Sequence, residues 1–396
     1  LVGHHLAPNT MTAKKVVVFG TTLPLTAKAF LLPLLRELAQ RGWDVHLVTS
    51  PGPGTEDLAQ LPFMTTDPVP MRPSISPIQD TRGLREWIRV LRRLRPSVVV
   101  AGTPKAGLLG ILAAKLTGVP RRIYHVRGLR AEGEHGLRRV LLLAMERGAC
   151  SAATIVLANS HSLKTALVRS RITSRDKIIV LGSGSSQGVD TQYFRPPSAL
   201  ERAEARQALK LINGQVAVGF AGRLTRDKGI LDLVKAMHEL ADEFPQARLV
   251  VAGGTDHAHP LSDRQLEELN TSWCHVVGQL DDMRTFYWAI DIFCLPSFRE
   301  GFPNVNLEAA ACGLPVVTTT ATGCIDSIHI NETGLAVKPG DTQQLSEALR
   351  LLIGSSNDRS RLGRAGRFRA ERDFSQDEVV RLFAEQLAGP PGPEQR

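Results

Sequence analysis

The sequence predicts an α/β fold made of two doubly wound parallel sheets, and three observations lead to that prediction. Short apolar runs such as 16–19 and 216–220 have the continuous composition of parallel strands that are buried on both faces. Amphipathic stretches alternate with these runs, which is the order produced by crossover helices between parallel strands. The alternation begins a second time after Pro196 and Pro197. Paired prolines can neither continue a helix nor sit in a central strand, so they indicate a linker between the two segments.

The domain boundaries follow from this alternation. We expect an N-terminal Rossmann-like domain over residues 11–195, a second over 196–375, and a C-terminal helix and tail over 376–396. Residues 1–10 are interpreted as a leader or remnant outside the fold, since Met11, shortly before the first apolar run, is a more natural first residue. The first domain has predicted strands 16–19, 45–48, 98–100, 123–126, 154–158 and 178–181, and predicted helices 30–38, 84–94, 107–117 and 136–147. The second has predicted strands 216–220, 248–251, 275–277, 292–294 and 316–318, and predicted helices 229–243, 261–268, 282–289 and 304–312.

Composition and charge exclude several classes of protein. The 396 residues are 43% hydrophobic and 22% charged, which is typical of a globular protein. No apolar run reaches the roughly 18 residues that span a bilayer. The net charge of +9 divides into +15 for residues 1–195 and −6 for residues 196–396. Aromatic residues are few and no RNA-binding motif occurs, so the basic half argues for an anionic or membrane-held partner and against nucleic acid.

Cysteine usage bears on the compartment. The five cysteines are odd in number, widely spaced and form no CxxC pair, so we expect buried, reduced thiols. The first residues lack the pattern of a signal peptide. We therefore expect a cytoplasmic protein, and the basic half extends this expectation to the inner face of the membrane.

Several familiar nucleotide and metal motifs are missing. No GxxxxGK[ST] motif occurs, and the glycine-rich loop 182–188 is not followed by a helix that could hold a pyrophosphate. That loop, which includes Ser185, is interpreted either as flexible or as contacting an acceptor. No Asp-x-Asp pair occurs, and His257 and His259 have no third ligand in view. We therefore expect no metal.

A basic turn follows the strand 216–220. Gly222 and Arg223 end that strand, and Asp227, Lys228 and Gly229 precede the next helix. A guanidinium and an ammonium beside a helix N-terminus can hold a diphosphate through charge-assisted hydrogen bonds. The alternative is an ion pair between Asp227 and Lys228 at the start of the helix.

Two glutamates stand around the start of helix 304–312. Glu300 lies in the preceding turn, Asn304 is expected to be the N-cap, and Glu308 lies about one turn into the helix. Both carboxylates can then face the cleft and accept hydrogen bonds from the vicinal hydroxyls of a sugar. Alternatively, Glu308 only interacts with the helix dipole and Glu300 is a solvated loop residue.

Together these motifs resemble the retaining glycosyltransferase family 4, in particular its capsule-type and lipopolysaccharide-type subgroup. The resemblance covers about 216–350 and is looser in the first half. The motifs of the second half are Ala221-Gly-Arg-Leu, Asp227-Lys-Gly, Val251-Ala-Gly-Gly, Glu300-Gly-Phe-Pro-Asn with Glu308-Ala, Ala311-Cys-Gly-Leu-Pro-Val-Val and Asn331-Glu-Thr-Gly-Leu. Those of the first half are Thr103-Pro-Lys-Ala-Gly, Val119-Pro-Arg-Arg-Ile-Tyr, Arg127-Gly-Leu-Arg and the segment 181–190.

The resemblance implies a GT-B fold, with a nucleotide sugar held mainly by the second domain and an acceptor mainly by the first. It also implies retention of the anomeric configuration. The residues it places in catalysis are Glu300, Arg223 and Lys228. Those it places around the donor are Gly222, Gly254, Gln279, Gly301, Phe302, Pro303, Asn304 and Glu308. On the acceptor side we expect Gly20, Thr21, Lys105, His125, Arg127 and Ser185.

The chain departs from many relatives in two places. The loop after the first strand has one glycine, Gly20, where a Gly-Gly-x-Gly pattern is common. Arg127 stands where many relatives carry a histidine, and His125 lies two residues upstream. Arg127, with Arg130, could engage a phosphate, and the alternative for His125 is a plain strand residue. No catalytic base is assigned.

Helix 84–94 is basic and amphipathic. One face carries apolar residues including Trp87, and arginines surround it. Such a helix can lie on anionic lipid, and this favours a peripheral membrane contact. The preferred interpretation of its apolar face is ordinary packing on the sheet, which leaves the arginines in solvent.

The sequence therefore predicts a retaining, metal-independent glycosyltransferase. It is expected to move a hexose-type sugar from a nucleotide donor, UDP in our expectation, to a glycan or lipid-linked acceptor in polysaccharide biosynthesis. No cofactor is expected, because the nucleotide sugar is a co-substrate. Three alternatives stay open: a transferase of secondary-metabolite biosynthesis, a UDP-sugar 2-epimerase, and a non-catalytic scaffold. The pattern of Glu300 and Glu308 favours a transferase over an epimerase, and intact Arg223 and Lys228 argue against a scaffold.

Overall fold

Strands and helices alternate throughout the part of the chain described by the structure, a computed structural model that covers residues 15–72, 76–256 and 260–389. The chain divides into two units, one made of Leu1–Tyr124 and Ala152–Thr154, the other of His125–Ser151 and Ile155–Arg396. The predicted domain boundary at Pro196 and Pro197 stays a prediction.

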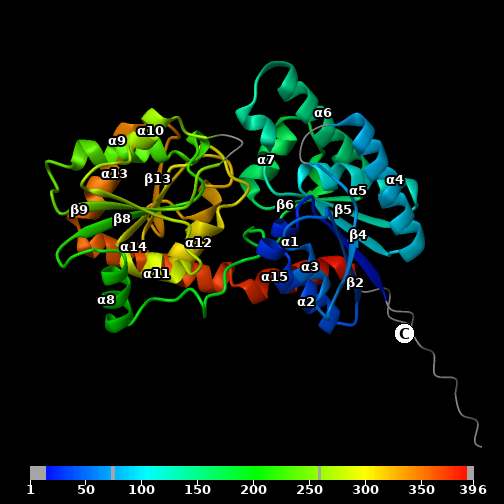
Figure 1. The fold of residues 1–396 in the computed structure, drawn as a ribbon, viewed down its shortest axis with the longest axis horizontal. Coiled ribbons are helices and arrows are strands. Elements are labelled where there is room, and N and C mark those ends of the chain that lie inside the picture. The colour runs from blue at the N-terminus through cyan, green and yellow to red at the C-terminus, as the bar shows by residue number, and fades with distance from the viewer. Residues whose placement is uncertain (1–14, 73–75, 257–259, 390–396) are drawn as a thin grey trace, which may run out of the picture. The chain divides into compact units, whose positions relative to one another are not determined.

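The first sheet has seven strands in the order β3-β2-β1-β4-β5-β6-β7 (Figure 1). The strands are β1 (Val16–Gly20), β2 (Asp44–Thr49), β3 (Thr65–Pro68), β4 (Val98–Gly102), β5 (Arg121–Val126), β6 (Ile155–Ala158) and β7 (Ile178–Ile179). The helices between them are α1 (Pro24–Phe30), α2 (Leu32–Gln40), α3 (Thr55–Ala59), α4 (Pro77–Leu94), α5 (Pro104–Leu116), α6 (Gly136–Ala152) and α7 (His161–Arg169), with short 3₁₀ turns η1 (Arg130–Gly133) and η2 (Arg175–Lys177). Strand β1 lies between β2 and β4 and pairs with both in parallel. The sheet therefore extends from β1 in both directions.

Three expectations for this sheet need correction. The predicted helix 30–38 corresponds to α2, but α2 begins at Leu32. Phe30 ends the separate helix α1, and Pro33 has no N–H with which that earlier helix could continue. Helix α4 begins at Pro77, seven residues before the predicted start. Strand β3 and helix α3 were not predicted, since β3 is a four-residue edge strand without an apolar run.

The second sheet has six parallel strands in the order β10-β9-β8-β11-β12-β13. They are β8 (Val216–Ala221), β9 (Ala247–Ala252), β10 (Cys274–Gly278), β11 (Ile292–Leu295), β12 (Val316–Thr319) and β13 (Gly334–Val337). The remaining helices are α8 (Ala199–Ala208), α9 (Ile230–Leu240), α10 (Asp263–Glu267), α11 (Met283–Ala289), α12 (Asn304–Ala311), α13 (Thr342–Gly354), α14 (Ser356–Asp373) and α15 (Gln376–Ala388), with 3₁₀ turns η3 (Arg226–Lys228) and η4 (Ile325–Ser327). The strand order reverses between β8 and β11, and ligands of doubly wound sheets bind beyond the carboxyl ends of strands at such a point.

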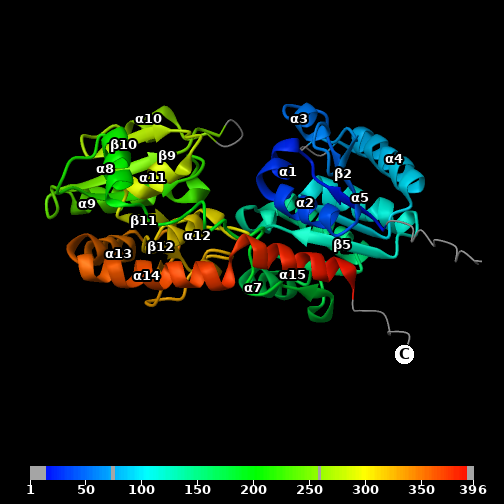
Figure 2. The same cartoon turned by 90° about the horizontal axis from the view of Figure 1, so that it is seen from below.

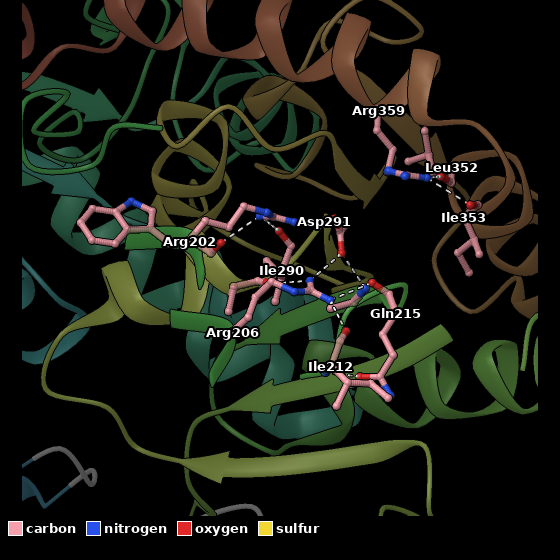
Figure 3. A network of polar contacts seen from close by, with 12 residues as sticks. Arg202, Arg206, Ile212, Gln215, Ile290, Asp291, Leu352, Ile353 and Arg359 are labelled. Carbon is pink, nitrogen blue, oxygen red and sulfur yellow. Dashed lines mark hydrogen bonds and ion pairs between the residues drawn. The ribbon is translucent and has the colours of Figure 1, made fainter. Parts of the chain in front are cut away.

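Asp291 fixes helix α8 to the starts of β8 and β11. Its carboxylate accepts hydrogen bonds from Arg202 at 2.7 Å and from the backbone N–H of Ala217 at 2.8 Å (Figure 3). Arg206 donates to the same carboxylate and to the carbonyl oxygens of Ile212 and Gln215. This network holds the ends of two central strands opposite the edge where a ligand is expected.

Helix α15 follows α14 after a short break and packs on elements of the 125–190 segment (Figure 2). The Phe383 ring meets the His125 ring edge to face at a centroid distance of 5.4 Å. The chain reaches α15 through a β-bridge between Val189 and Ser375. The five cysteines are buried and unbonded, as expected. Among the described residues, no helix is long and apolar enough to cross a membrane.

Candidate functional site

A polar cavity of about 160 Å³ lies beyond the carboxyl ends of β8 and β11, where the strand order reverses. All of its lining residues belong to the second unit. They are Gly128, Leu129, Glu132, Arg223, Asp227, Lys228, Arg299, Glu300 and Gly301. Three cationic and three acidic side chains therefore meet around one small space, and the three predicted catalytic residues are among them.

The turn between β8 and α9 supplies the first cations. Gly222 has a φ of 155° and Gly229 a φ of 73°, so both occupy backbone conformations that L-residues rarely adopt. A side chain at Gly229 would also overlap the carbonyl oxygen of Pro296. Arg223 is paired with Asp256, and Lys228 with Glu300. The alternative of an Asp227–Lys228 ion pair is thus replaced by a pair that joins two loops.

The β11–α12 loop is fastened to the β8–α9 turn. Ser297 Oγ donates a 2.9 Å hydrogen bond to the carbonyl of Asp227, and the backbone N–H of Phe298 donates to the same oxygen at 2.9 Å. Arg299 lies 3.5 Å from the carboxylate of Asp227. These contacts hold Lys228, Arg299 and Glu300 at one edge of the cavity.

The segment after β5 forms another wall. A side chain at Gly301 would overlap the carbonyl oxygen of Arg127, so only glycine permits this close approach. Thr322 Oγ1 donates a 2.9 Å hydrogen bond to Glu132 Oε1, and the Thr322 carbonyl accepts from the N–H of Glu300 at 2.9 Å. Neither Glu132 nor Arg299 was selected from the sequence, although both adjoin motifs that were.

Glu308 lies one turn into α12 and does not line the cavity. Tyr287 donates a 2.8 Å hydrogen bond to Glu308 Oε2. Burial raises the pKa of the Glu308 carboxyl, and the Tyr287 hydrogen bond opposes that rise. Its predicted contact with a ribose stays a prediction.

The prediction that Asn304 caps α12 is wrong. The N-cap position is held by Pro303, whose extended backbone leaves Asn304 as the first helical residue. The side-chain oxygen and nitrogen of Asn304 are both buried and have no hydrogen-bond partner among the described residues. Such atoms need a partner, so Asn304 fits the predicted contact with a ligand better than a cap would.

The other predicted donor residues lie at the same edge of the second sheet. Gly254 follows β9, and its carbonyl accepts a 2.9 Å hydrogen bond from the N–H of Leu224. Gln279 follows β10, and the Phe302 ring is buried against Phe374 at a centroid distance of 5.3 Å. Gly254 also lines a separate cavity of about 490 Å³ beside β9 and β10.

Three predicted acceptor residues come together in the first unit. Gly20 is the last residue of β1 and Thr21 follows it, and Lys105 lies in the first turn of α5 after β4. Thr22 N–H donates to Thr103 Oγ1 at 3.1 Å, which joins these two strand ends. Lys105 is buried and donates to Asp80 at 2.5 Å.

Two of the other three acceptor candidates, His125 and Ser185, meet at Asn159, a residue that was not predicted. His125 Nε2 lies 2.6 Å from Asn159 Oδ1, and the Asn159 carbonyl accepts a 2.7 Å hydrogen bond from the N–H of Ser185. Burial, with the nearby charge of Arg127, lowers the pKa of His125 to about 3, so the ring is neutral at physiological pH. Burial likewise lowers the pKa of Arg127 to about 10.

Two further expectations concern other regions. Trp87 is fully buried, so the preferred interpretation of the α4 apolar face as sheet packing is confirmed. His257 and His259, the weak metal candidate, lie outside the described residues.

Comparison with known proteins decides the family. Residues 201–369 match the family "Glycosyl transferases group 1", and residues 27–184 match the "Glycosyl transferase 4-like domain". The capsular polysaccharide biosynthesis glycosyltransferase CapM of Staphylococcus aureus is 34% identical over 350 residues, 87% of this chain and 90% of that protein. The chain belongs to the family 4-like glycosyltransferases. The resemblance to this family and its capsule-type members is thereby confirmed. The prediction that the chain is an enzyme, a glycosyltransferase, is confirmed as well.

Other relatives agree with this assignment. The N,N'-diacetylbacillosaminyl-diphospho-undecaprenol alpha-1,3-N-acetylgalactosaminyltransferase of Campylobacter jejuni is 27% identical over 331 residues, 82% of this transferase and 85% of that protein. Anabaena Alr3699/HepE, solved in complex with UDP, superposes with a TM-score of 0.79 and 19% identity over 96% of this chain and all of that one. WaaG, a glycosyltransferase involved in lipopolysaccharide biosynthesis, superposes with a TM-score of 0.72 and 17% identity over 94% of this chain and all of that one. These likenesses confirm the GT-B fold.

Proposed function

We propose that this transferase moves a hexose-type sugar from UDP to a glycan or lipid-linked acceptor in polysaccharide biosynthesis, with retention and without a metal ion. The observation that carries the proposal is the cavity at the switch point of the second sheet, where Arg223, Lys228 and Arg299 gather. The relatives support it: CapM is named for capsular polysaccharide, and HepE was solved with UDP.

The cations match the charge that develops in the reaction. The bond between the anomeric carbon and the β-phosphate oxygen breaks, and the electron pair leaves with UDP. A hydroxyl oxygen of the acceptor bonds to the anomeric carbon on the same face, and its proton passes to the departing phosphate. Arg223 and Lys228 stabilise that phosphate through charge-assisted hydrogen bonds held ready before the reaction.

The carboxylates have a separate role. Glu300 pairs with Lys228 and can accept hydrogen bonds from donor hydroxyls, while Glu308 accepts from the ribose. The unpartnered side chain of Asn304 and the backbone N–H groups of Gly301, Phe302 and Asn304 complete the contacts to the sugar and phosphate. In this proposal Gln279 contacts the base and Gly254 lies beside the donor.

Metal independence rests on the same cations, because they supply the positive charge that a divalent ion would otherwise bring. Among the described residues, no three His, Cys, Asp or Glu side chains gather as a metal site would require. A test is transfer activity in the presence of EDTA, which we expect to be unchanged.

The donor site is tested by UDP titration calorimetry on the full chain. Arg223→Ala and Lys228→Ala should each weaken UDP binding at least tenfold, since a hydrogen bond to a charged group contributes about 1.5–3 kcal/mol. Arg226→Ala, on the same 3₁₀ turn but not lining the cavity, is the matched control. Unchanged UDP binding in both site variants would refute the donor assignment.

The reaction itself is tested by a donor screen with lipid-linked and soluble acceptors, read by mass spectrometry. A mass gain of one hexose on an acceptor supports transfer. An epimerised free UDP-sugar, which has the same mass as the donor and is identified by NMR, would instead indicate an epimerase. The lipid-linked class is favoured because the Campylobacter relative is named for a diphospho-undecaprenol substrate. With such an acceptor, we infer that the transferase works at the inner face of the membrane as a peripheral protein.

A further inference from the structure

The first half of α6 carries an apolar ridge that no described element covers. Leu137 is 84% exposed, Val140 61% and Leu141 44%. These residues are three or four apart, so they share one face of the helix. By contrast, Ala149 and Cys150 near the end of α6 are buried. Contiguous exposed apolar surface of this kind is typical of an interaction site.

A cationic groove of about 430 Å³ lies on the neighbouring helix. It is lined by His161, Lys164, Thr165, Val168, Arg169 and Arg175, with no acidic side chain among them. The side chains of Lys164, Arg169 and Arg175 form no ion pair with any residue in the described ranges, and neither does Arg139 beside the ridge. On α4, Arg89 pairs with Glu86 and Arg93 with Asp67. Arg82, Arg85 and Arg92 of the same helix form no ion pair within the described ranges, so they provide a matched set of unpaired cations.

The ridge and the groove belong to one surface. Arg147 of α6 donates 3.1 Å hydrogen bonds to the carbonyls of Ser170 and Arg171, directly after α7. Lys177 of η2 donates to the carbonyl of Ser151 at 3.1 Å. The second half of α6 is thus fastened to the elements that form the groove, as the adjacent helices in Figure 1 show. We call the ridge and the groove together the α6–α7 face.

We propose that the α6–α7 face docks on an anionic phospholipid bilayer. Leu137, Val140 and Leu141 enter the boundary between headgroups and acyl chains, and the groove binds lipid phosphates. The charge identifies this occupant: a second copy of the chain related by a two-fold axis would set unpaired arginines against unpaired arginines. A negatively charged surface neutralises them.

This proposal rests on the proposed function, because it concerns the membrane surface on which a lipid-linked acceptor would lie. Gly128, Leu129 and Glu132 line the catalytic cavity, and α6 begins only four residues after Glu132. A bilayer against the ridge therefore lies close to one wall of the cavity. A sugar acceptor on a membrane lipid would reach that wall without leaving the bilayer.

The test is flotation of the full chain with vesicles of phosphatidylcholine alone or with 30% phosphatidylglycerol. We expect binding only to the anionic vesicles. The variant Arg139→Gln/Arg169→Gln/Arg175→Gln should lower the partition coefficient more than tenfold, since one charge near such a surface changes it about fivefold. The control Arg82→Gln/Arg85→Gln/Arg92→Gln removes the same charge from exposed positions of α4 and should change it little. Equal losses in both variants, or none, would overturn the proposal.

The ridge has its own variant and control. Leu137→Gln/Leu141→Gln should lower vesicle binding more than tenfold, whereas Leu200→Gln/Ile212→Gln, at scattered exposed positions, should not. Light scattering gives the oligomeric state. A wild-type dimer that becomes monomeric in the ridge variant, with vesicle binding unchanged, would show a copy interface instead.

UDP titration separates this proposal from the previous one. We expect every variant of the face and its controls to bind UDP as the wild type does. If neither the wild type nor any variant binds UDP while the vesicle results follow the pattern above, the donor assignment fails and the membrane face stands.

Discussion

The hydroxyl of Tyr287 on α11, a buried residue, donates a 2.8 Å hydrogen bond to Oε2 of the partly buried Glu308 on α12. Burial raises the pKa of Glu308 above its ordinary value, and this hydrogen bond opposes the rise. The folded state therefore binds a proton at Glu308 more tightly than the unfolded state does. Its contribution to stability is present below about pH 4.3 and is lost as the pH rises through the raised pKa.

Replacing Tyr287 with phenylalanine should destabilise the transferase and increase this pH dependence. The buried carboxylate loses its donor, so we expect the free energy of unfolding to fall by about 1–3 kcal/mol at pH 8 and by less at pH 5. Urea unfolding at both pH values measures the difference. Tyr193→Phe, which removes a 3.0 Å hydrogen bond to Asp282 at an exposed site, is the control and should cost less than about 1 kcal/mol. Equal effects at pH 5 and pH 8 would contradict the assignment to Glu308.

Gly301 and Gly254 should respond differently to alanine. A methyl group at Gly301 overlaps the carbonyl oxygen of Arg127, whereas one at Gly254 meets no atom within 4 Å. We expect Gly301→Ala to lower the free energy of unfolding by about 3 kcal/mol. Gly254→Ala should fold normally and lose UDP affinity, if the donor occupies that space. Thermal unfolding together with UDP titration distinguishes the two roles, and a stable Gly301→Ala protein would refute the close approach.

Gly20 has a packing role besides its predicted place on the acceptor side. A methyl group there would lie 2.7 Å from the Trp87 ring, which is fully buried. We expect Gly20→Ala to lower the free energy of unfolding by about 1–3 kcal/mol through overpacking. Gly52→Ala, with no atom within 4 Å, should stay within about 0.5 kcal/mol of the wild type in the same urea titration.

His46 and Asp67 form a buried pair at 2.8 Å in the first unit. The hydrogen bond that His46 donates to the Asp67 carboxylate raises the pKa of His46, although burial lowers it. Burial alone would raise the pKa of Asp67, but hydrogen bonds from His46 and Arg93 hold it below its ordinary value. The His46 contribution is present below about pH 6.5 and is lost as the pH rises through the raised pKa.

The Asp67 contribution has the opposite sign. It is present above about pH 3.9 and is lost as the pH falls through the lowered pKa. His46→Asn should therefore flatten the decline in unfolding free energy between pH 6 and pH 8.5 that the wild type shows. A decline of the same size in both proteins, measured in urea, would contradict this assignment.

Most strands could be predicted because their apolar runs are continuous. Val216–Ala221 and Val98–Gly102 are almost wholly buried, and this burial produces the pattern that identified them. Strand β3 could not be found in this way, because it is an edge strand whose register on β2, not its own composition, defines it. The break between α1 and α2 depends on one proline whose effect the apolar periodicity conceals.

The residues of the candidate site likewise fall into those that local sequence predicts and those that only the tertiary structure reveals. Arg223, Lys228 and Glu300 stand in short motifs, so the sequence predicted them and the fold brings them to one cavity. Glu132 and Asn159 were missed because their partners, Thr322 and His125, lie 190 and 34 residues away in the chain. Such pairings arise only from tertiary structure. Asn304 shows the converse, since a residue type that favours caps is displaced by the proline before it.

The packing of Phe383 on His125 has a consequence for how the protein is made. A ribosome releases His125 more than two hundred residues before it releases α15, so the ring stays without its cover during most of translation. The native surroundings of β5 can form only when the last helix has emerged. We therefore expect nascent chains stalled before residue 376 to be captured by chaperones far more often than chains released after residue 388.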